Sequence, residues 1–165
     1  MRHNPERLQA LKSLALLDTA TEVVYDDLTR TLAKTFDVPI SMVNLLDADR
    51  DWFKACIGIT LLESPAETSF CEIFFHCDDD LMVIPDTTAD ARFSNHPLVV
   101  DAPFIRFYAS ARLAYEGHTV GTLCIYDTKP KDISAEQVET LGILRLAAME
   151  TLAKRARAVQ QGNPL

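Results

Sequence analysis

The sequence of 165 residues lacks the features of several large protein classes. Its apolar runs are too short to cross a bilayer. Residues 1–5 show no apolar core and no cleavage site, so we expect no signal peptide and a cytoplasmic location. Basic residues are few, 16 against 24 acidic, and the formal net charge is −8. An acidic surface repels phosphate backbones, so we expect no nucleic-acid partner, and because the apolar runs are too short we expect no membrane partner either.

Glycine is also scarce, with five residues in the chain. They form neither a phosphate-binding loop nor a dinucleotide fingerprint, and no serine stands in a nucleophile elbow. The four cysteines and four histidines have no metal-ligand spacing. Asp47, Asp49 and Asp51 alternate like the start of a calcium loop, but Trp52 and Gly58 replace the glycine and the closing acid. We therefore predict a solvated turn there and no metal site.

The N-terminal part of the chain has the pattern of two helices. Asn4 and Pro5 are a capping residue and a first-turn proline, which predicts a helix over about residues 5–17. Thr19 and Glu22 have the spacing of a capping box, which predicts that a second helix begins there.

The C-terminal helix has the clearest pattern in the chain. Ser134 and Gln137 have capping-box spacing, and an apolar seam follows, which predicts a helix over about residues 134–159. The far end of this seam, Leu152 to Val159, has two interpretations. It packs within one subunit, or it pairs with the same helix of a second subunit; we favour the homodimer.

The middle of the chain has the pattern of antiparallel hairpins. Ser69 and Glu72 again have capping-box spacing and predict a short helix over about residues 70–77. β-Branched and aromatic side chains between turn-forming residues predict strands at 40–46, 52–57, 81–84, 105–115 and 118–126. Hairpins between terminal helices indicate an α+β fold with one central antiparallel sheet and the two terminal helices packed together, as a single domain over residues 1–165.

Six short segments, in this order, carry a resemblance to a known family. They are Trp52-Phe53-Lys54-Ala55, Ser69-Phe70-Cys71, Asp90-Ala91-Arg92-Phe93, Asn95-His96-Pro97-Leu98-Val99, Ile105-Arg106-Phe107-Tyr108-Ala109 and Gly121-Thr122-Leu123-Cys124-Ile125-Tyr126-Asp127. The chain resembles the GAF domains of bacterial signalling proteins, most of all those found ahead of histidine kinase or diguanylate cyclase domains. The resemblance covers roughly residues 7 to 155.

The resemblance implies a central antiparallel sheet with helices on both faces and a sensory or regulatory role rather than catalysis. It names no ligand and no cofactor. Similar domains that bind bilins carry His after the attachment Cys, where this chain has Glu72 after Cys71, and the signature of cyclic-nucleotide binding is absent. The chain also departs from the family pattern at Phe74, Ser110 and Arg112, and Phe74 is expected to fill part of the pocket.

Six residues are candidates for ligand binding, and none is assigned a catalytic or metal-binding role. They are Cys71, Asp86, Arg106, Tyr108, Thr122 and Cys124. Cys71 near a helix N-terminus would have a lowered pKa and a reactive thiol, or it is a buried small apolar residue. Thr122 and Cys124 alternate on the last strand, share one face, and are expected to form the pocket floor.

The other three candidates each have a structural alternative. Arg106 would bind an anionic ligand, or would form an ion pair with Asp86 or Asp90. Tyr108, placed on the same strand face, would line the pocket or extend its hydroxyl to water. Asp86 would cap the turn that follows it or would contact the ligand.

These observations lead to one functional prediction and two alternatives. We expect a cytoplasmic GAF-type sensory domain that binds a small molecule and transmits the signal through its terminal helices in a dimer. Its output would be a kinase or cyclase domain. The first alternative is a thiol-dependent reductase of the free methionine sulfoxide type. The second is a dimerisation module without a ligand.

Overall fold

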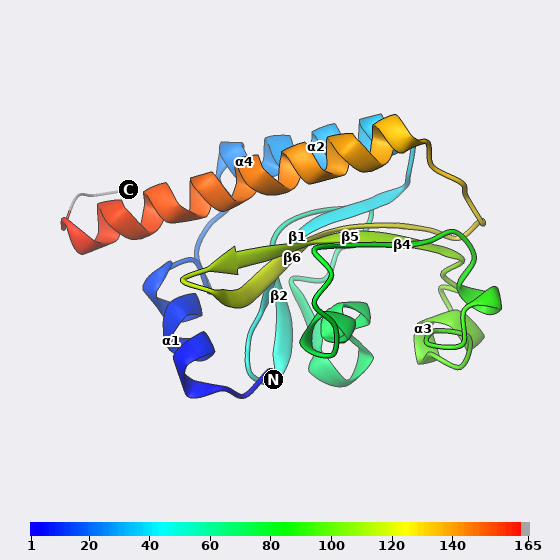
Figure 1. Ribbon diagram of the computed structural model, residues 1–165, viewed down its shortest axis with the longest axis horizontal. Helices are drawn as coiled ribbons and strands as arrows, with labels where there is room; N and C mark the ends of the chain where they lie inside the picture. Colours follow the sequence, from blue (N-terminus) through cyan, green and yellow to red (C-terminus); the bar gives the residue numbers. More distant parts are fainter. Residues whose placement is uncertain (163–165) are drawn as a thin grey trace.

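The computed structural model describes residues 1–162 and has the predicted α+β architecture, with one six-stranded antiparallel sheet (Figure 1). The strand order is β3-β2-β1-β6-β5-β4, and every neighbouring pair is antiparallel. The strands are β1 (Ile40–Leu46), β2 (Arg50–Ile57), β3 (Glu63–Pro65), β4 (Leu81–Ile84), β5 (Phe107–Tyr115) and β6 (His118–Asp127). The four longest predicted strands differ from these bounds by at most two residues at either end.

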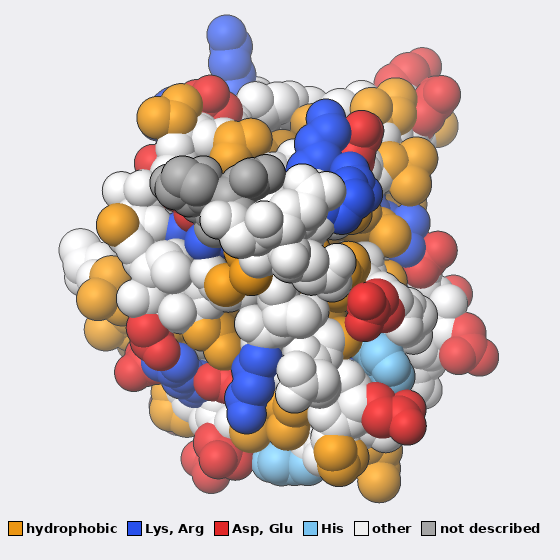
Figure 2. All heavy atoms as spheres, turned by 90° about the vertical axis from the view of Figure 1, so that its left-hand side faces the viewer, with side chains coloured by type: hydrophobic (Ala, Val, Ile, Leu, Met, Phe, Trp, Pro, Cys, Tyr) orange, Lys and Arg blue, Asp and Glu red, His pale blue; other side chains and the backbone are white. Residues whose placement is uncertain are grey.

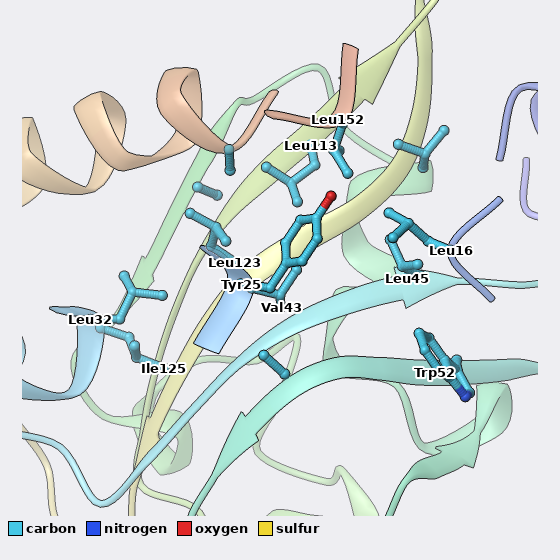
Figure 3. Packing of buried hydrophobic residues seen from close by; sticks show 14 of the residues in the cluster. Leu16, Tyr25, Leu32, Val43, Leu45, Trp52, Leu113, Leu123, Ile125 and Leu152 are labelled. Carbon is cyan, nitrogen blue, oxygen red and sulfur yellow. The ribbon is translucent and has the colours of Figure 1, made fainter. Parts of the chain in front are cut away.

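Two long helices, α2 (Val23–Phe36) and α4 (Ala135–Gln160), cover one face of the sheet (Figure 1). They are antiparallel, because Gln137 of α4 donates to the carbonyl of Thr35 and Arg155 binds Glu22. Between them and the sheet lies the larger hydrophobic core. Figure 3 shows Tyr25 of α2 in this core, beside Leu113 of the sheet and Leu152 of α4.

Short helical segments cover the other face. They are the 3₁₀ helices η1 (Ala66–Thr68), η2 (Phe70–Phe75) and η3 (Thr87–Ala89) and the one-turn helix α3 (Pro97–Val100). A second hydrophobic cluster lies between these segments and the sheet, and it contains Phe70, Phe93, Tyr108 and Tyr126. Helices and helical segments therefore lie on both faces, as the family resemblance implied.

The first helix is shorter than predicted, and the second begins later. α1 spans Pro5–Ser13 and is capped by Asn4, whose side chain accepts from the amide of Arg7. It ends because Ala15 adopts a positive φ. The Thr19–Glu22 capping box does not form: the Thr19 hydroxyl donates to the carbonyl of Leu16, and α2 begins at Val23 without a side-chain cap.

The capping box of α4 forms as predicted between Ser134 and Gln137. The C-terminal part of α4 contacts the segment directly after α1, because Arg155 donates to the carbonyls of Leu14 and Ala15. Leu152 and Ala156 are fully buried in their own subunit. The predicted pairing surface over Leu152 to Val159 is therefore wrong in these positions.

The exposed apolar side chains of α4 lie earlier in the helix. Ile143 and Leu146 are 59% and 61% exposed, three residues apart on one face. Figure 2 views the end of the molecule at which α4 terminates, and acidic and basic side chains are mixed over that face. Within residues 1–162, no helix has both the length and the apolar character needed to cross a membrane.

Candidate functional site

A cavity of about 460 Å³ lies on the sheet face that carries the short helices. Strands β1, β2 and β6, the segment from Gly58 to Phe70, and the α3 region line it. Its walls are mainly apolar: Ile40, Met42, Phe53, Ile59, Leu61, Phe70, Leu98, Pro103, Ile105 and Tyr126. A volume of this size and a largely apolar lining are typical of small-molecule sites.

One end of this cavity is polar and is formed by Asn44, Asp51, Ser64, Thr68 and Ser69, which we call the polar end. Asp51 on β2 is 3% exposed. Its carboxylate accepts from Arg2 at 2.8 Å, from Asn44 at 3.1 Å and from Ser69 at 2.5 Å. The prediction of a solvated turn is wrong for Asp51, because alternation along β2 turns this side chain inward together with Phe53.

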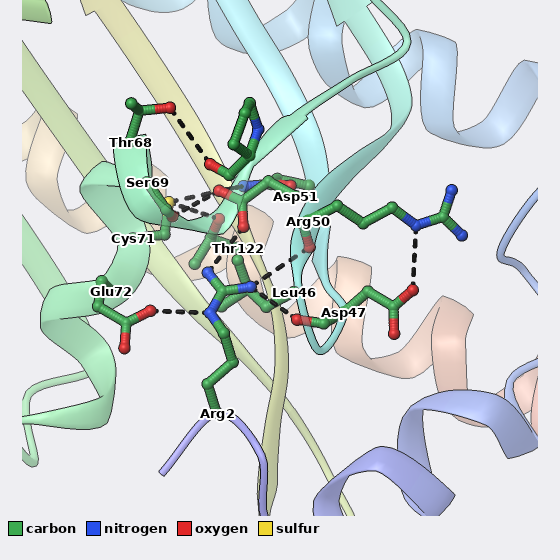
Figure 4. Close-up of polar contacts among 12 residues, drawn as sticks. Arg2, Leu46, Asp47, Arg50, Asp51, Thr68, Ser69, Cys71, Glu72 and Thr122 are labelled. Carbon is green, nitrogen blue, oxygen red and sulfur yellow. Dashed lines mark hydrogen bonds and ion pairs between the residues drawn. The ribbon is translucent and has the colours of Figure 1, made fainter.

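Arg2 lies next to the polar end, and Figure 4 shows its guanidinium between Glu72 and Asp51. Its guanidinium binds Asp51 and Glu72, and it also donates to the backbone carbonyls of Asp47 and Arg50. Burial opposes the charge of Arg2, but Asp51 and Glu72 outweigh it, so the pKa of Arg2 is raised. A charge buried with these partners fixes the N-terminus against the site.

Ser69 and Glu72 do not form the predicted capping box. Ser69 makes no side-chain cap to η2, because its hydroxyl donates to Asp51. Glu72 instead binds Arg2. The helix here is a 3₁₀ segment that ends at Phe75, shorter than the predicted helix over 70–77.

Four of the six predicted binding residues meet in one buried cluster. The Cys71 sulfur lies 3.3 Å from the Tyr108 hydroxyl, 3.1 Å from the Thr122 hydroxyl and 3.5 Å from the Cys124 sulfur. All four side chains are fully buried. None of them lines the 460 Å³ cavity; the cluster touches its polar end through Asn44, whose amide nitrogen is 3.7 Å from the Cys71 sulfur. Their role in binding stays a prediction.

The environment of this cluster shifts the pKa values of the two thiols in opposite directions. Burial opposes ionisation of Cys71, but hydrogen bonds from Cys124, Thr122 and Tyr108 to its sulfur lower its pKa. Burial raises the pKa of Cys124 well above its ordinary value. Cys71 is therefore the thiol of this pair that ionises first.

Asp86 and Arg106 lie away from the cavity. Asp86 is the cap of η3 and accepts from the amide and hydroxyl of Thr88, which lower the pKa of its carboxyl. Arg106 precedes β5 rather than sharing a strand face with Tyr108, and it donates to the carbonyls of Val99 and Ile105. Both contacts are local and structural.

Phe74 does not fill the cavity, contrary to the prediction from the family pattern. It is buried, but it is absent from the cavity lining, and the Arg112 guanidinium lies 5.4 Å from its ring centroid. Two departures from the family pattern thus pack against each other. Among residues 1–162, no three or more His, Cys, Asp or Glu side chains are grouped to hold a metal ion.

Sequence reasoning missed Arg2, Asn44 and Asp51. Asn44 carried a signal, since it is the single amide in the strand over residues 40–46, whose other side chains are apolar except for Ser41. Such an amide needs hydrogen-bond partners when it is buried. Arg2 carried none, because its partners lie far away in the sequence.

Comparison with protein families places this chain in a known group. The family model described as "GAF domain" matches residues 20–152. The chain belongs to the GAF domain family. GAF domains are general sensory and regulatory domains, and this one shares their α+β architecture.

A curated relative of this GAF domain is a cyclic di-GMP phosphodiesterase of Pseudomonas aeruginosa, 34% identical over 144 residues. The match covers 84% of this chain and 24% of that protein, so the chain spans about a quarter of the relative's length.

Solved structures show the same fold at low identity. The GAF domain of an Acinetobacter phosphoenolpyruvate-protein phosphotransferase has a TM-score of 0.68 and 16% identity, with 94% of this chain and 97% of that chain covered. A type II free methionine-R-sulfoxide reductase from Thermoplasma acidophilum has a TM-score of 0.63 and 14% identity, with 87% and 96% covered. At this identity the likeness concerns the fold alone.

Proposed function

We propose that this GAF domain is a sensory domain that binds a small molecule in the 460 Å³ cavity and transmits its occupancy to α4. The observation that carries the proposal is the cavity itself, with its apolar walls and one buried polar end. A bound apolar molecule would restore the packing contacts that the lining side chains lack. The polar end would orient that molecule.

A chain of contacts leads from the cavity to α4. Phe53 lines the cavity, and the next residue, Lys54, points to the opposite sheet face. The Lys54 ammonium is fully buried and lies 2.6 Å from the Glu22 carboxylate. Glu22 also binds Arg155 of α4 at 2.9 Å. A shift of β2 on ligand binding would therefore change an ion pair that holds the end of α4.

The signal would pass to a second copy of the chain and to an output domain. We propose that two copies pair through the exposed face of α4 at Ile143 and Leu146, because a twofold interface uses the same patch on both subunits. The relative that is a cyclic di-GMP phosphodiesterase is much longer than this chain. An output domain of the kinase or cyclase class would act beside this domain in a longer assembly.

A reductase is the second candidate function, and the short distance between the Cys71 and Cys124 sulfurs, 3.5 Å, favours it. Two such thiols could reduce a sulfoxide to a thioether and water while forming one disulfide. Neither sulfur lines the cavity, however, and both residues are fully buried, so the geometry favours binding. Turnover of free methionine sulfoxide that is lost in Cys71→Ser would establish the reductase instead.

The binding proposal is tested by a fragment screen observed on the ¹⁵N-labelled protein by NMR. Ile59→Trp places a large side chain in the cavity, whereas Leu62→Trp adds the same group at a position 76% exposed in the same loop and outside the lining. We expect hits to shift cavity residues in the unmodified protein and in Leu62→Trp, and binding to be lost in Ile59→Trp. Absence of cavity hits, or equal binding to both variants, would contradict the proposal.

A further inference from the structure

The side-chain amide of Asn44 has a hydrogen-bonded nitrogen and, among the described residues, an oxygen that is not hydrogen-bonded. Asn44 on β1 is 1% exposed and lines the cavity. Its nitrogen donates to the Asp51 carboxylate at 3.1 Å, and since an ionised carboxylate only accepts, this bond fixes which way the amide is turned. The amide oxygen, Oδ1, is buried and has no hydrogen-bond partner within residues 1–162.

Two of the three serine and threonine hydroxyls at the polar end already use their protons within the protein. Ser69 donates to Asp51, and Thr68 donates to the carbonyl of Pro65. What these groups can still offer a ligand is acceptor capacity. Together with the free oxygen of Asn44 and the Asp51 carboxylate, they make the polar end rich in acceptors, and the Ser64 hydroxyl can donate or accept.

The charge at the polar end is negative, which also favours a ligand that donates hydrogen bonds. Asp51 is the charged residue of the cavity lining, and no Lys, Arg or His lines the cavity in the described part of the chain. The nearby cation, Arg2, lies behind Asp51 and is held by Asp51, Glu72 and two backbone carbonyls. An anionic group of a ligand would therefore lose its hydration without gaining a cationic partner.

We propose that the ligand is neutral or cationic, with a mainly aromatic or aliphatic body and an N–H donor that binds Asn44 Oδ1. This inference rests on the proposed function of the cavity. The apolar walls would contact the body, and the donor would satisfy the amide oxygen that, within residues 1–162, is left buried and unpaired in the cavity lining. Amines and nitrogen heterocycles have this chemistry, whereas carboxylates and phosphate esters, including cyclic dinucleotides, do not.

The test compares matched probes on the unmodified protein by NMR titration. Indole and benzofuran have nearly the same shape, but only indole donates an N–H. Tryptamine and indole-3-propionate share the indole body and differ in the charge of the side chain. In the first pair, we expect indole to bind roughly tenfold more tightly than benzofuran. In the second pair, we expect tryptamine to bind more tightly than indole-3-propionate by at least the same factor.

Two variants test whether the preference for indole over benzofuran depends on Asn44 Oδ1. Asn44→Leu removes the free oxygen, and we expect the difference between indole and benzofuran to fall to about twofold or less. Met42→Leu, on the same face of β1 and in the same cavity, changes only an apolar wall and should keep the full preference. The titrations of the unmodified protein decide the inference even where Asn44→Leu does not fold.

The outcomes separate this inference from the function on which it rests. Equal binding within each pair, or tighter binding of benzofuran or indole-3-propionate, would overturn the donor inference and leave the sensory function standing. If none of the four probes shifts cavity residues, the inference also fails. The fragment screen then decides separately whether the cavity binds small molecules at all.

Discussion

Asn44 and Asp51 face each other from neighbouring strands, with the amide nitrogen of Asn44 3.1 Å from the carboxylate of Asp51. This bond has two consequences. It leaves the amide oxygen of Asn44 as a buried acceptor without a donor. It also links the cavity to the Asp51–Arg2 ion pair, so that residue 2 of the chain helps to form a site built mainly on the central sheet.

Removal of the Asp51 charge should lower the stability of the folded protein. Asp51→Asn leaves the buried guanidinium of Arg2 without its one buried carboxylate partner among residues 1–162, and we expect the free energy of unfolding to fall by about 3 kcal/mol in urea denaturation. Asp49→Asn is the matched control, because the Asp49 side chain is 92% exposed, and it should change stability by less than about 0.5 kcal/mol. Similar effects of the two substitutions would show that the Arg2 ion pair is not structural.

His96 should make the cavity wall sensitive to pH. Its Nδ1 accepts from the amide of Leu98, and its ring lies 4.2 Å from that of Phe70; both neighbours line the cavity. Burial lowers the pKa of His96 below its ordinary value of 6.5, so the unfolded chain takes up the proton more readily. The stability due to neutral His96 is therefore present above that value and is lost as the pH falls below it.

The variant His96→Asn isolates this effect. Asparagine can cap α3 but does not titrate in this range, so the melting temperature of His96→Asn should fall less than that of the unmodified protein between about pH 7.5 and pH 5. The other histidines are common to both proteins and cancel in the comparison. Parallel pH profiles would show that His96 does not contribute.

The four cysteines should separate into two classes by reactivity. Cys56 and Cys77 are partly exposed, whereas Cys71 and Cys124 are fully buried. Under native conditions we expect iodoacetamide to modify Cys77 roughly a hundredfold faster than Cys71, because Cys71 reacts only when the structure opens. Peptide mass mapping over time measures both rates. Equal rates would favour a reactive Cys71 and the reductase function.

The exposed face of α4 should control the oligomeric state. We expect the unmodified chain to sediment as a dimer, and the double variant Ile143→Glu and Leu146→Glu to sediment as a monomer because it buries charge in the interface. Leu62→Glu, at an exposed apolar position in the cavity loop, should remain a dimer. A monomeric unmodified protein, or a dimeric double variant, would contradict this interface.

Capping patterns show what local sequence could and could not predict. Ser134 with Gln137 and Ser69 with Glu72 have the same spacing, but only the first pair forms a capping box. The difference arises from the fold. The Ser69 hydroxyl donates to Asp51, which lies 18 residues away in sequence, and Glu72 accepts a hydrogen bond from Arg2. The hairpin strands and α4 were predictable because their signals are local and periodic.

The cavity was not predictable in the same way. Cys71, Tyr108, Thr122 and Cys124 come together as a cluster, but the cavity lies beside them on residues from β1, β2 and the segment that follows. Which side chains line a cavity depends on strand register and on long-range pairs such as Arg2 with Asp51. No spacing rule in the sequence encodes either.

The most direct test of the central claim is a crystal structure of the protein with tryptamine. We expect the indole body between the apolar walls of the cavity and an N–H nitrogen of the probe within hydrogen-bond distance of Asn44 Oδ1. Tryptamine bound outside the cavity, or bound within it with Asn44 Oδ1 still unpaired, would contradict the account.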